Sequence, residues 1–157
     1  MEKIAIFVDV QNIYYTTRDS YHKHFNYNAF WREAVQDREL VAALAYATDR
    51  GDTKQLIFQQ ILKNIGFTIK LKPYIQRRDG SAKGDWDVGI TLDVLDYAPK
   101  VDRIILLSGD GDFDLLLLKI RKDFGVFSQV YGVESLTAPS LIRAADQFVP
   151  IGAELLM

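Results

Sequence analysis

Three stretches of this chain place aspartates at the point where a buried strand would end. Two of them follow continuous apolar runs at residues 4–8 and 104–107, and the third lies in a polar stretch near residue 85. The aspartates concerned are Asp9, Asp87, Asp110 and Asp112. Open parallel sheets bind ligands at the edge where the carboxyl ends of the strands meet. Clustered like charges at such an edge repel one another unless a cation neutralises them, and an all-oxygen ligand set favours Mg²⁺ or Mn²⁺.

Strands and helices are predicted to alternate along the chain. The predicted strands are 4–8, 41–47 (alanine-rich enough to be read also as a helix), 67–74, 103–107 and 126–131. The predicted helices are 53–65, 85–97, 115–124 and 138–148, with a polar loop over 75–84. This alternation implies right-handed crossovers, and therefore an α/β fold of three layers with a mostly parallel central sheet and helices on both faces.

The composition narrows the class of protein. A chain of 157 residues with 48% hydrophobic residues predicts one soluble globular domain over residues 1–157. The absence of cysteine excludes thiol catalysis, disulfides and zinc-thiolate sites. No apolar run is long enough to span a bilayer and no signal peptide is recognisable. We therefore expect a cytoplasmic protein without membrane association.

The net charge of −2 does not by itself indicate a nucleic-acid partner. If four of the 21 acidic residues bind metal, 17 remain against 19 basic residues. A bound cation would mask the acidic centre. The net charge therefore neither predicts nor excludes a nucleic-acid partner.

An aromatic segment over residues 14–31 has little clean periodicity. Its aromatic residues are Tyr14, Tyr15, Tyr21, Phe25, Tyr27, Phe30 and Trp31. They would serve either as a base-stacking flap beside Asp9 or as a lid packed on the core or on a second subunit. The general enrichment of aromatic residues in cores and interfaces favours packing, and the segment makes a homodimer a candidate assembly.

The stretch from Ser108 to Phe113 is the most specific pattern. A calcium loop would need glycine where Leu115 stands and glutamate where Arg121 stands, so that interpretation fails. A dinucleotide fingerprint lacks its third glycine and would set aspartates against a pyrophosphate. One aspartate would be enough to cap the following helix, and Asp110, Asp112 and Asp114 are more than a cap needs.

The opening strand argues against one phosphatase mechanism. A phosphatase of the haloacid dehalogenase type would have a second aspartate at position 11, where this chain has Gln11. Asn12 is suited either to orient Asp9 or a phosphate, or to cap the next turn.

The polar stretch before residue 97 offers further candidates. Lys83 and Asp87 are four residues apart and share a helix face, whereas Asp93 lies roughly 120° around the helix from Asp87. Asp87 is therefore the better ligand candidate and Asp85 a candidate cap. Arg77 and Arg78 could grip phosphates or form a solvated turn.

The two histidines form a His-x-His pair, His22 and His24. No third strong ligand lies nearby in the sequence, so we expect surface histidines and no transition-metal site.

These motifs together resemble the NYN domain, in its LabA-like branch, within the PIN-like nuclease superfamily. The matching segments are Phe7-Val-Asp9-x-x-Asn12, Lys83-Gly-Asp-Trp-Asp87-Val with Asp93, and Ser108-Gly-Asp110-Gly-Asp112-Phe113. They cover nearly the whole chain in order. Trp86 stands where the family more often has a small aliphatic residue, and Asp114 adds a carboxylate that the pattern does not require.

The resemblance implies a metal-dependent nuclease of the three-layer PIN-like fold, with RNA the commoner substrate and DNA the alternative. It makes Asp9, Asp87, Asp110 and Asp112 the set that binds Mg²⁺ or Mn²⁺, with Asn12 and Lys83 as further catalytic candidates. Outer-shell candidates are Asp93, Ser108 and Asp114. Two other functions stay open: a non-catalytic metal- and RNA-binding regulatory module, and a small-molecule phosphohydrolase.

Overall fold

The central feature of the structure is a parallel sheet of six strands. The computed structural model describes the backbone of residues 1–73, 75–76, 82–83 and 85–157, and the side chains of residues 1–72 and 85–157. In spatial order the strands are β3 (Thr68–Pro73), β2 (Arg38–Asp49), β1 (Glu2–Asp9), β6 (Arg103–Leu107), β7 (Phe127–Gly132) and β8 (Gln147–Pro150). Every neighbouring pair is parallel. The chain builds outward from β1 in one direction and from β6 in the other, so the strand order reverses between these two central strands.

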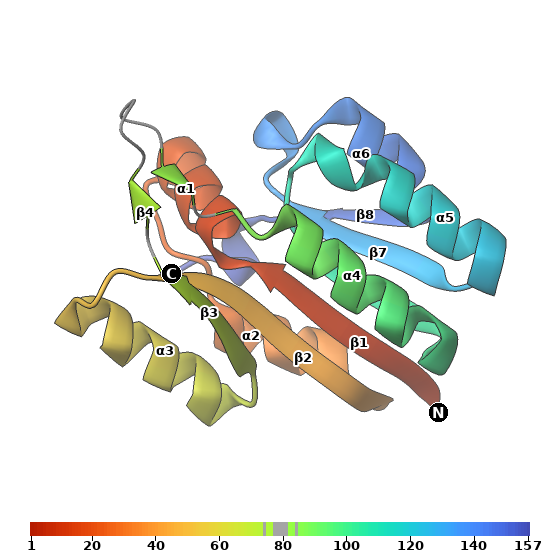
Figure 1. Cartoon of the computed structure of the whole chain (residues 1–157), viewed down its shortest axis with the longest axis horizontal. Helices are drawn as coiled ribbons and strands as arrows, with labels where there is room; N and C mark the ends of the chain where they lie inside the picture. Colours follow the sequence, from red (N-terminus) through yellow and green to blue (C-terminus); the bar gives the residue numbers. More distant parts are fainter. Residues whose placement is uncertain (74, 77–81, 84) are drawn as a thin grey trace.

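Helices cover both faces of this sheet, which confirms the predicted three-layer architecture (Figure 1). One face carries α1 (Val10–Tyr21), α2 (Tyr27–Val35) and α3 (Thr53–Ile65). The other carries α4 (Asp87–Tyr97), α5 (Asp114–Phe124) and α6 (Pro139–Ala144).

Strand β1 divides the core into two layers by simple alternation. Ile4, Ile6 and Val8 face the layer of α1–α3, whereas Ala5 and Phe7 face the layer of α4–α6. All five side chains are fully buried. A strand buried on both faces reads as a continuous apolar run, which is why the sequence already indicated a central strand.

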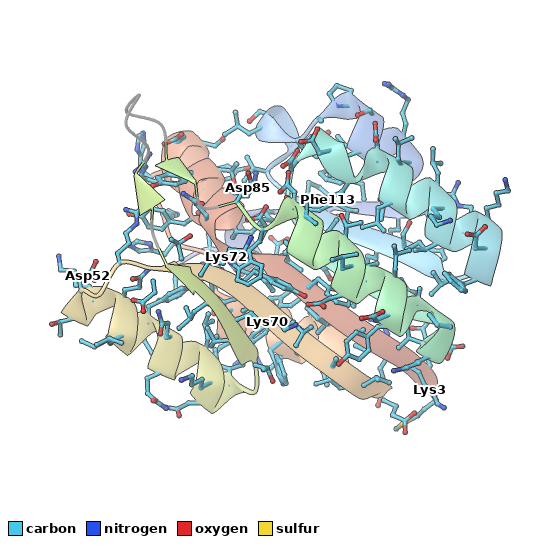
Figure 2. The ribbon with its side chains drawn as sticks, in the orientation of Figure 1. Lys3, Asp52, Lys70, Lys72, Asp85 and Phe113 are labelled. Carbon is cyan, nitrogen blue, oxygen red and sulfur yellow. The ribbon has the colours of Figure 1, made fainter. Side chains whose placement is uncertain are left out.

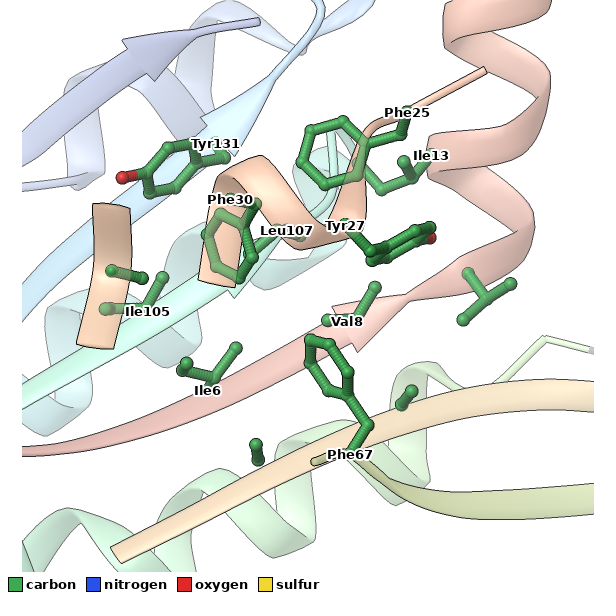
Figure 3. Close-up of a cluster of buried hydrophobic side chains, with 14 of the residues drawn as sticks. Ile6, Val8, Ile13, Phe25, Tyr27, Phe30, Phe67, Ile105, Leu107 and Tyr131 are labelled. Carbon is green, nitrogen blue, oxygen red and sulfur yellow. The ribbon is translucent and has the colours of Figure 1, made fainter. Parts of the chain in front are cut away.

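The aromatic segment belongs mainly to the first of these layers. Phe25, Tyr27 and Phe30 are buried, and Figure 3 shows them gathered over β1 and β6. The rings of Phe25 and Tyr27 meet edge to face with their centroids 4.9 Å apart. Packing on the core is therefore confirmed for these three rings, whereas Tyr14 and Tyr21 stay 45% and 38% exposed.

The predicted helix 53–65 matches α3 at both ends. Asp52 caps its first turn by accepting a hydrogen bond from the Gln55 N–H at 2.7 Å. Gly66 ends it with a φ of 137°, a conformation that favours glycine. A Cβ at Gly66 would also lie 2.6 Å from the ring of Trp31.

The structure corrects two predicted elements, the helix over 138–148 and the loop over 75–84. The helix expected over 138–148 ends at Ala144, and the strand β8 follows it. The Asp146 carboxylate explains the change, because it accepts a hydrogen bond from the Ser128 N–H at 2.8 Å and pairs with Arg121 at 3.0 Å. These bonds fasten the chain beside β7, and a strand forms there instead of further helix.

The loop expected over 75–84 contains a short antiparallel ladder of β4 (Ile75–Gln76) and β5 (Ala82–Lys83). The rest of that stretch lies outside the described residues, including Arg77 and Arg78. The alanine-rich run 41–47 lies within β2, so its interpretation as a strand is confirmed.

Candidate metal centre

Asp9 ends β1 at the point where the strand order reverses. It caps α1, and its Oδ1 accepts a hydrogen bond from the Asn12 N–H at 3.4 Å. Its Oδ2 accepts a hydrogen bond from the Ser108 hydroxyl, at the end of β6, at 3.1 Å. The carboxylate is therefore fixed by the first turn of α1 and by the residue that follows β6.

Asn12 and Ser108 hold the two adjoining loops together. The Gly109 N–H donates to the Asn12 Oδ1 at 2.9 Å, and the Asp110 N–H donates to the buried Ser108 hydroxyl at 3.2 Å. A Cβ at Gly109 would lie 2.8 Å from the Leu136 carbonyl oxygen. Asn12 and Ser108 thus position the loop that carries Asp110.

The loop after β6 turns sharply into a short 3₁₀ helix at Gly111–Phe113. The Asp110 Oδ1 accepts a hydrogen bond from the Asp112 N–H at 2.9 Å, so Asp110 does cap this turn. Asp114 begins α5, and its Oδ1 accepts from the Leu115 N–H at 2.6 Å. The capping interpretation holds for Asp110, yet its carboxylate also faces further carboxylates.

The third carboxylate comes from the start of α4. Asp85 accepts a hydrogen bond from the Asp87 N–H at 3.2 Å, whereas the N-cap position of α4 is held by Trp86. Carboxylate oxygens of Asp87, Asp110 and Asp112 lie within 4.8 Å of one another. Asp9, Asp85, Asp87 and Asp110 line one pocket of about 260 Å³. Figure 2 labels Asp85 on the segment that leads into α4.

Burial, with the charges of neighbouring carboxylates added to it, raises the pKa values of two of these carboxyls. Burial raises the pKa of Asp9 to about 6, with the charges of Asp110 and Asp85 adding to it, against the hydrogen bonds from Asn12 and Ser108. Burial, a hydrogen bond with Asp110 and the neighbouring charges raise the pKa of Asp87 to about 8. These two carboxyls therefore retain protons at pH values where ordinary aspartates are ionised.

The donor set fits a hard divalent cation. The ligand atoms of Asp87, Asp110 and Asp112 that converge are carboxylate oxygens, which Mg²⁺ and Mn²⁺ prefer. A cation among them would offset the burial and the repulsion that together hold the protons on Asp9 and Asp87.

The remaining predicted site residues lie apart from this cluster or outside what the structure describes. Asp93 accepts hydrogen bonds from the Tyr46 hydroxyl at 2.7 Å and the Lys70 ammonium at 2.6 Å, away from the three clustered carboxylates. The backbone of Lys83 lies in β5, but its side chain is outside the described residues. His22 and His24 are exposed, as expected.

Gln11, Tyr15 and Thr16 line the pocket together with the aspartates. Of these three, sequence reasoning placed only Tyr15 beside Asp9, as one of the aromatic residues that could form a base-stacking flap, and it did not assign Gln11 or Thr16 to the pocket. The Tyr15 hydroxyl accepts a hydrogen bond from the Arg50 guanidinium at 3.4 Å, which lowers the pKa of the tyrosine. The helical spacing of positions 11 and 15 after Asp9 could have indicated this shared face.

Fold and site together define a three-layer α/β protein of PIN-like type with an acidic centre at the carboxyl edge of its sheet. Residues 3–152 match the family model of the NYN domain, and the chain belongs to that family, which is a family of PIN-like nucleases. Among the described residues, no helix is both long enough and apolar enough to cross a membrane.

Two known proteins are similar to this chain over nearly its whole length. The chain is 26% identical over 160 residues to the low amplitude and bright protein LabA of Synechococcus elongatus, covering 95% of this chain and 83% of LabA. It is 57% identical to a protein of unknown function from Vibrio parahaemolyticus whose crystal structure superposes with a TM-score of 0.95, covering 99% of this chain and 96% of that one.

Proposed function

We propose that the protein is a metal-dependent nuclease that hydrolyses phosphodiester bonds, with RNA as the favoured substrate and DNA as the alternative. One observation carries the proposal: carboxylates of Asp87, Asp110 and Asp112 converge within 4.8 Å beside Asp9. Membership of the NYN family supports a nuclease-type hydrolase.

The charge of the site makes a cation necessary for this reaction. A phosphodiester carries a negative charge and would be repelled by a pocket that Asp9, Asp85, Asp87 and Asp110 line. Asp9, Asp87, Asp110 and Asp112 would hold Mg²⁺ or Mn²⁺, which supplies a water of lowered pKa and stabilises charge on the phosphate oxygens.

The chain's own residues set the geometry. Ser108 donates to Asp9, and Asn12 holds the loop of Asp110 through the Gly109 N–H. These bonds keep the carboxylates in place before substrate arrives, which lowers the cost of reorganisation during reaction. Lys83 stays our candidate for neutralising charge on a non-bridging phosphate oxygen.

The test is cleavage of end-labelled single-stranded RNA and DNA by the wild type and by Asp110→Asn, with Mn²⁺, Mg²⁺ or EDTA. Asp123→Asn is the matched control, because Asp123 is in the last turn of α5 and pairs with Lys119 on the protein surface. We expect metal-dependent cutting by the wild type and the control, and none by Asp110→Asn or in EDTA.

Retained cutting by a folded Asp110→Asn variant would contradict the assigned site. If the wild type binds the oligonucleotides and gains thermal stability with Mn²⁺ but cuts nothing, the non-catalytic module replaces the nuclease. Release of phosphate from p-nitrophenyl phosphate, without cutting, would favour the phosphohydrolase instead.

A further inference from the structure

We propose that a groove beside the acidic centre binds an unpaired nucleobase of the same strand whose phosphodiester lies at that centre. The inference rests on the proposed function and extends it to a substrate subsite. The groove has a volume of about 840 Å³ and lies between α1, the end of β2 and the start of α3. This volume is within the usual range of small-molecule sites.

The walls of the groove suit the flat faces of a base. Val10, Ala47 and Phe58 contribute apolar surface, and Tyr14 is 45% exposed. An exposed tyrosine ring offers a stacking surface that every base can use, since every base has a π-face. The groove therefore favours a single-stranded substrate over a duplex, in which the bases are already stacked on each other.

Neighbouring side chains hold the ring of Tyr14, which would be the stacking platform, in place. The Tyr14 ring meets the Tyr15 ring edge to face at 5.3 Å and stacks with His24 at 6.1 Å. The Arg18 guanidinium lies 5.6 Å from the centroid of the Tyr14 ring. A platform fixed in this way loses little side-chain entropy when a base stacks on it.

The groove adjoins the acidic pocket. Gln11 lines both. Tyr14 lines the groove while the next residue, Tyr15, lines the acidic pocket and accepts a hydrogen bond from Arg50 of the groove. One strand of nucleic acid can therefore lie across both.

The charges of the groove differ from those of the acidic pocket. Arg50 and Lys54 line the groove with one carboxylate, Asp52, which caps α3. Cations beside an aromatic platform are the combination that single-stranded nucleic acids use, for phosphate and base respectively. An acidic peptide without aromatic side chains would pair with the same cations but would leave the Tyr14 ring without a stacking partner.

The test is fluorescence anisotropy with fluorescein-labelled oligo(U) in millimolar Mg²⁺, using Asp110→Asn protein so that the probe is not cut. Into this parent we introduce Tyr14→Ala, Tyr14→Trp or Phe124→Ala. Phe124 is the matched control, because it is an exposed aromatic residue (44%) at the far end of α5. We expect Tyr14→Ala to weaken binding about tenfold or more, and the other two variants to bind like the parent. An abasic oligomer of the same length should bind weakly and equally to all four proteins.

A second variant tests the groove if Tyr14→Ala does not fold. Lys54→Gln should weaken oligo(U) binding at low salt and reduce the slope of log affinity against log salt by about 0.7. Equal binding by Tyr14→Ala and the parent, or equal binding of the abasic oligomer and oligo(U), would overturn the proposal.

The failures of the two proposals are distinguishable. Cleavage by wild-type protein with binding that is indifferent to Tyr14→Ala would leave the nuclease standing and remove the base subsite. Binding that depends on Tyr14 without any cleavage would keep the subsite as part of a nucleic-acid-binding module and remove the catalytic function.

Discussion

The buried carboxylate of Asp9 should make the metal-free protein less stable as the pH rises, and Asp9→Asn should relieve this loss. Below pH 3.8 the carboxyl is protonated in both folded and unfolded chains, so it makes no difference. Between 3.8 and about 6 the unfolded chain releases the proton and the folded protein retains it. Stability therefore falls across this window as the pH rises, and the full cost is present above it.

The magnitude follows from the pKa. A rise from 3.8 to about 6 corresponds to about 3 kcal/mol of unfolding free energy at pH 8. Asparagine keeps one acceptor oxygen for the Asn12 N–H or the Ser108 hydroxyl but loses hydrogen bonds to a charged acceptor, at a cost of about 1 kcal/mol. The net gain is about 2 kcal/mol, which raises the melting temperature by roughly 4–8 °C for a chain of this size.

The assay is thermal unfolding in EDTA from pH 4.5 to 8.5, followed by circular dichroism. Asp52→Asn is the control, because Asp52 is an exposed cap whose replacement by asparagine relieves no burial and keeps the cap. The advantage of Asp9→Asn should grow between pH 4.5 and 7 and then level off. Millimolar Mn²⁺ at pH 8 should stabilise the wild type more than Asp9→Asn. A difference that is the same at all pH values, or a less stable variant at pH 8, would refute burial as the cause.

Two further substitutions test the packing of the core and the extent of the metal centre. Phe30→Ala removes a fully buried ring that meets Tyr131 at 5.0 Å, and urea unfolding should show a loss of about 3–5 kcal/mol; a loss below 1 kcal/mol would contradict the packing described. Asp93→Ala leaves the Tyr46 hydroxyl and the Lys70 ammonium without the carboxylate they share, and should cost about 1–3 kcal/mol with Mn²⁺-dependent stabilisation intact. Loss of that metal response would instead place Asp93 in the outer shell of the centre.

The central part of the fold is predictable because its pattern is local. The run Ile4–Val8 and the helix 53–65 each carry their own burial pattern and stop signals. Strand β8 could not be predicted in this way, because Asp146 reaches residues 18 and 25 positions earlier in the chain, Ser128 and Arg121. Contacts over that distance decide whether the chain continues as helix, and no local pattern shows them.

The same distinction applies to the site. Aspartates that follow strands could be expected at one edge, because the carboxyl ends of parallel strands meet there. The partners of Asp93 could not, since Tyr46 and Lys70 belong to β2 and β3, which sequence places far from α4. The groove beside Tyr14 was also hidden, because α1, β2 and α3 form it together.

The N-termini of the helices cannot by themselves stabilise the ionised carboxylates of the acidic centre. Asp9 caps α1, Asp85 accepts a hydrogen bond from the first N–H of α4, and Asp110 caps the turn before α5. Each helix N-terminus favours a nearby carboxylate by about 0.3–1 kcal/mol. At Asp9 the pKa is raised to about 6 despite the helix N-terminus, so burial outweighs the contribution of the helix. The remaining cost is met by retained protons at low pH and, on our proposal, by a divalent cation at neutral pH, so metal affinity should increase as the pH rises from 6 to 8.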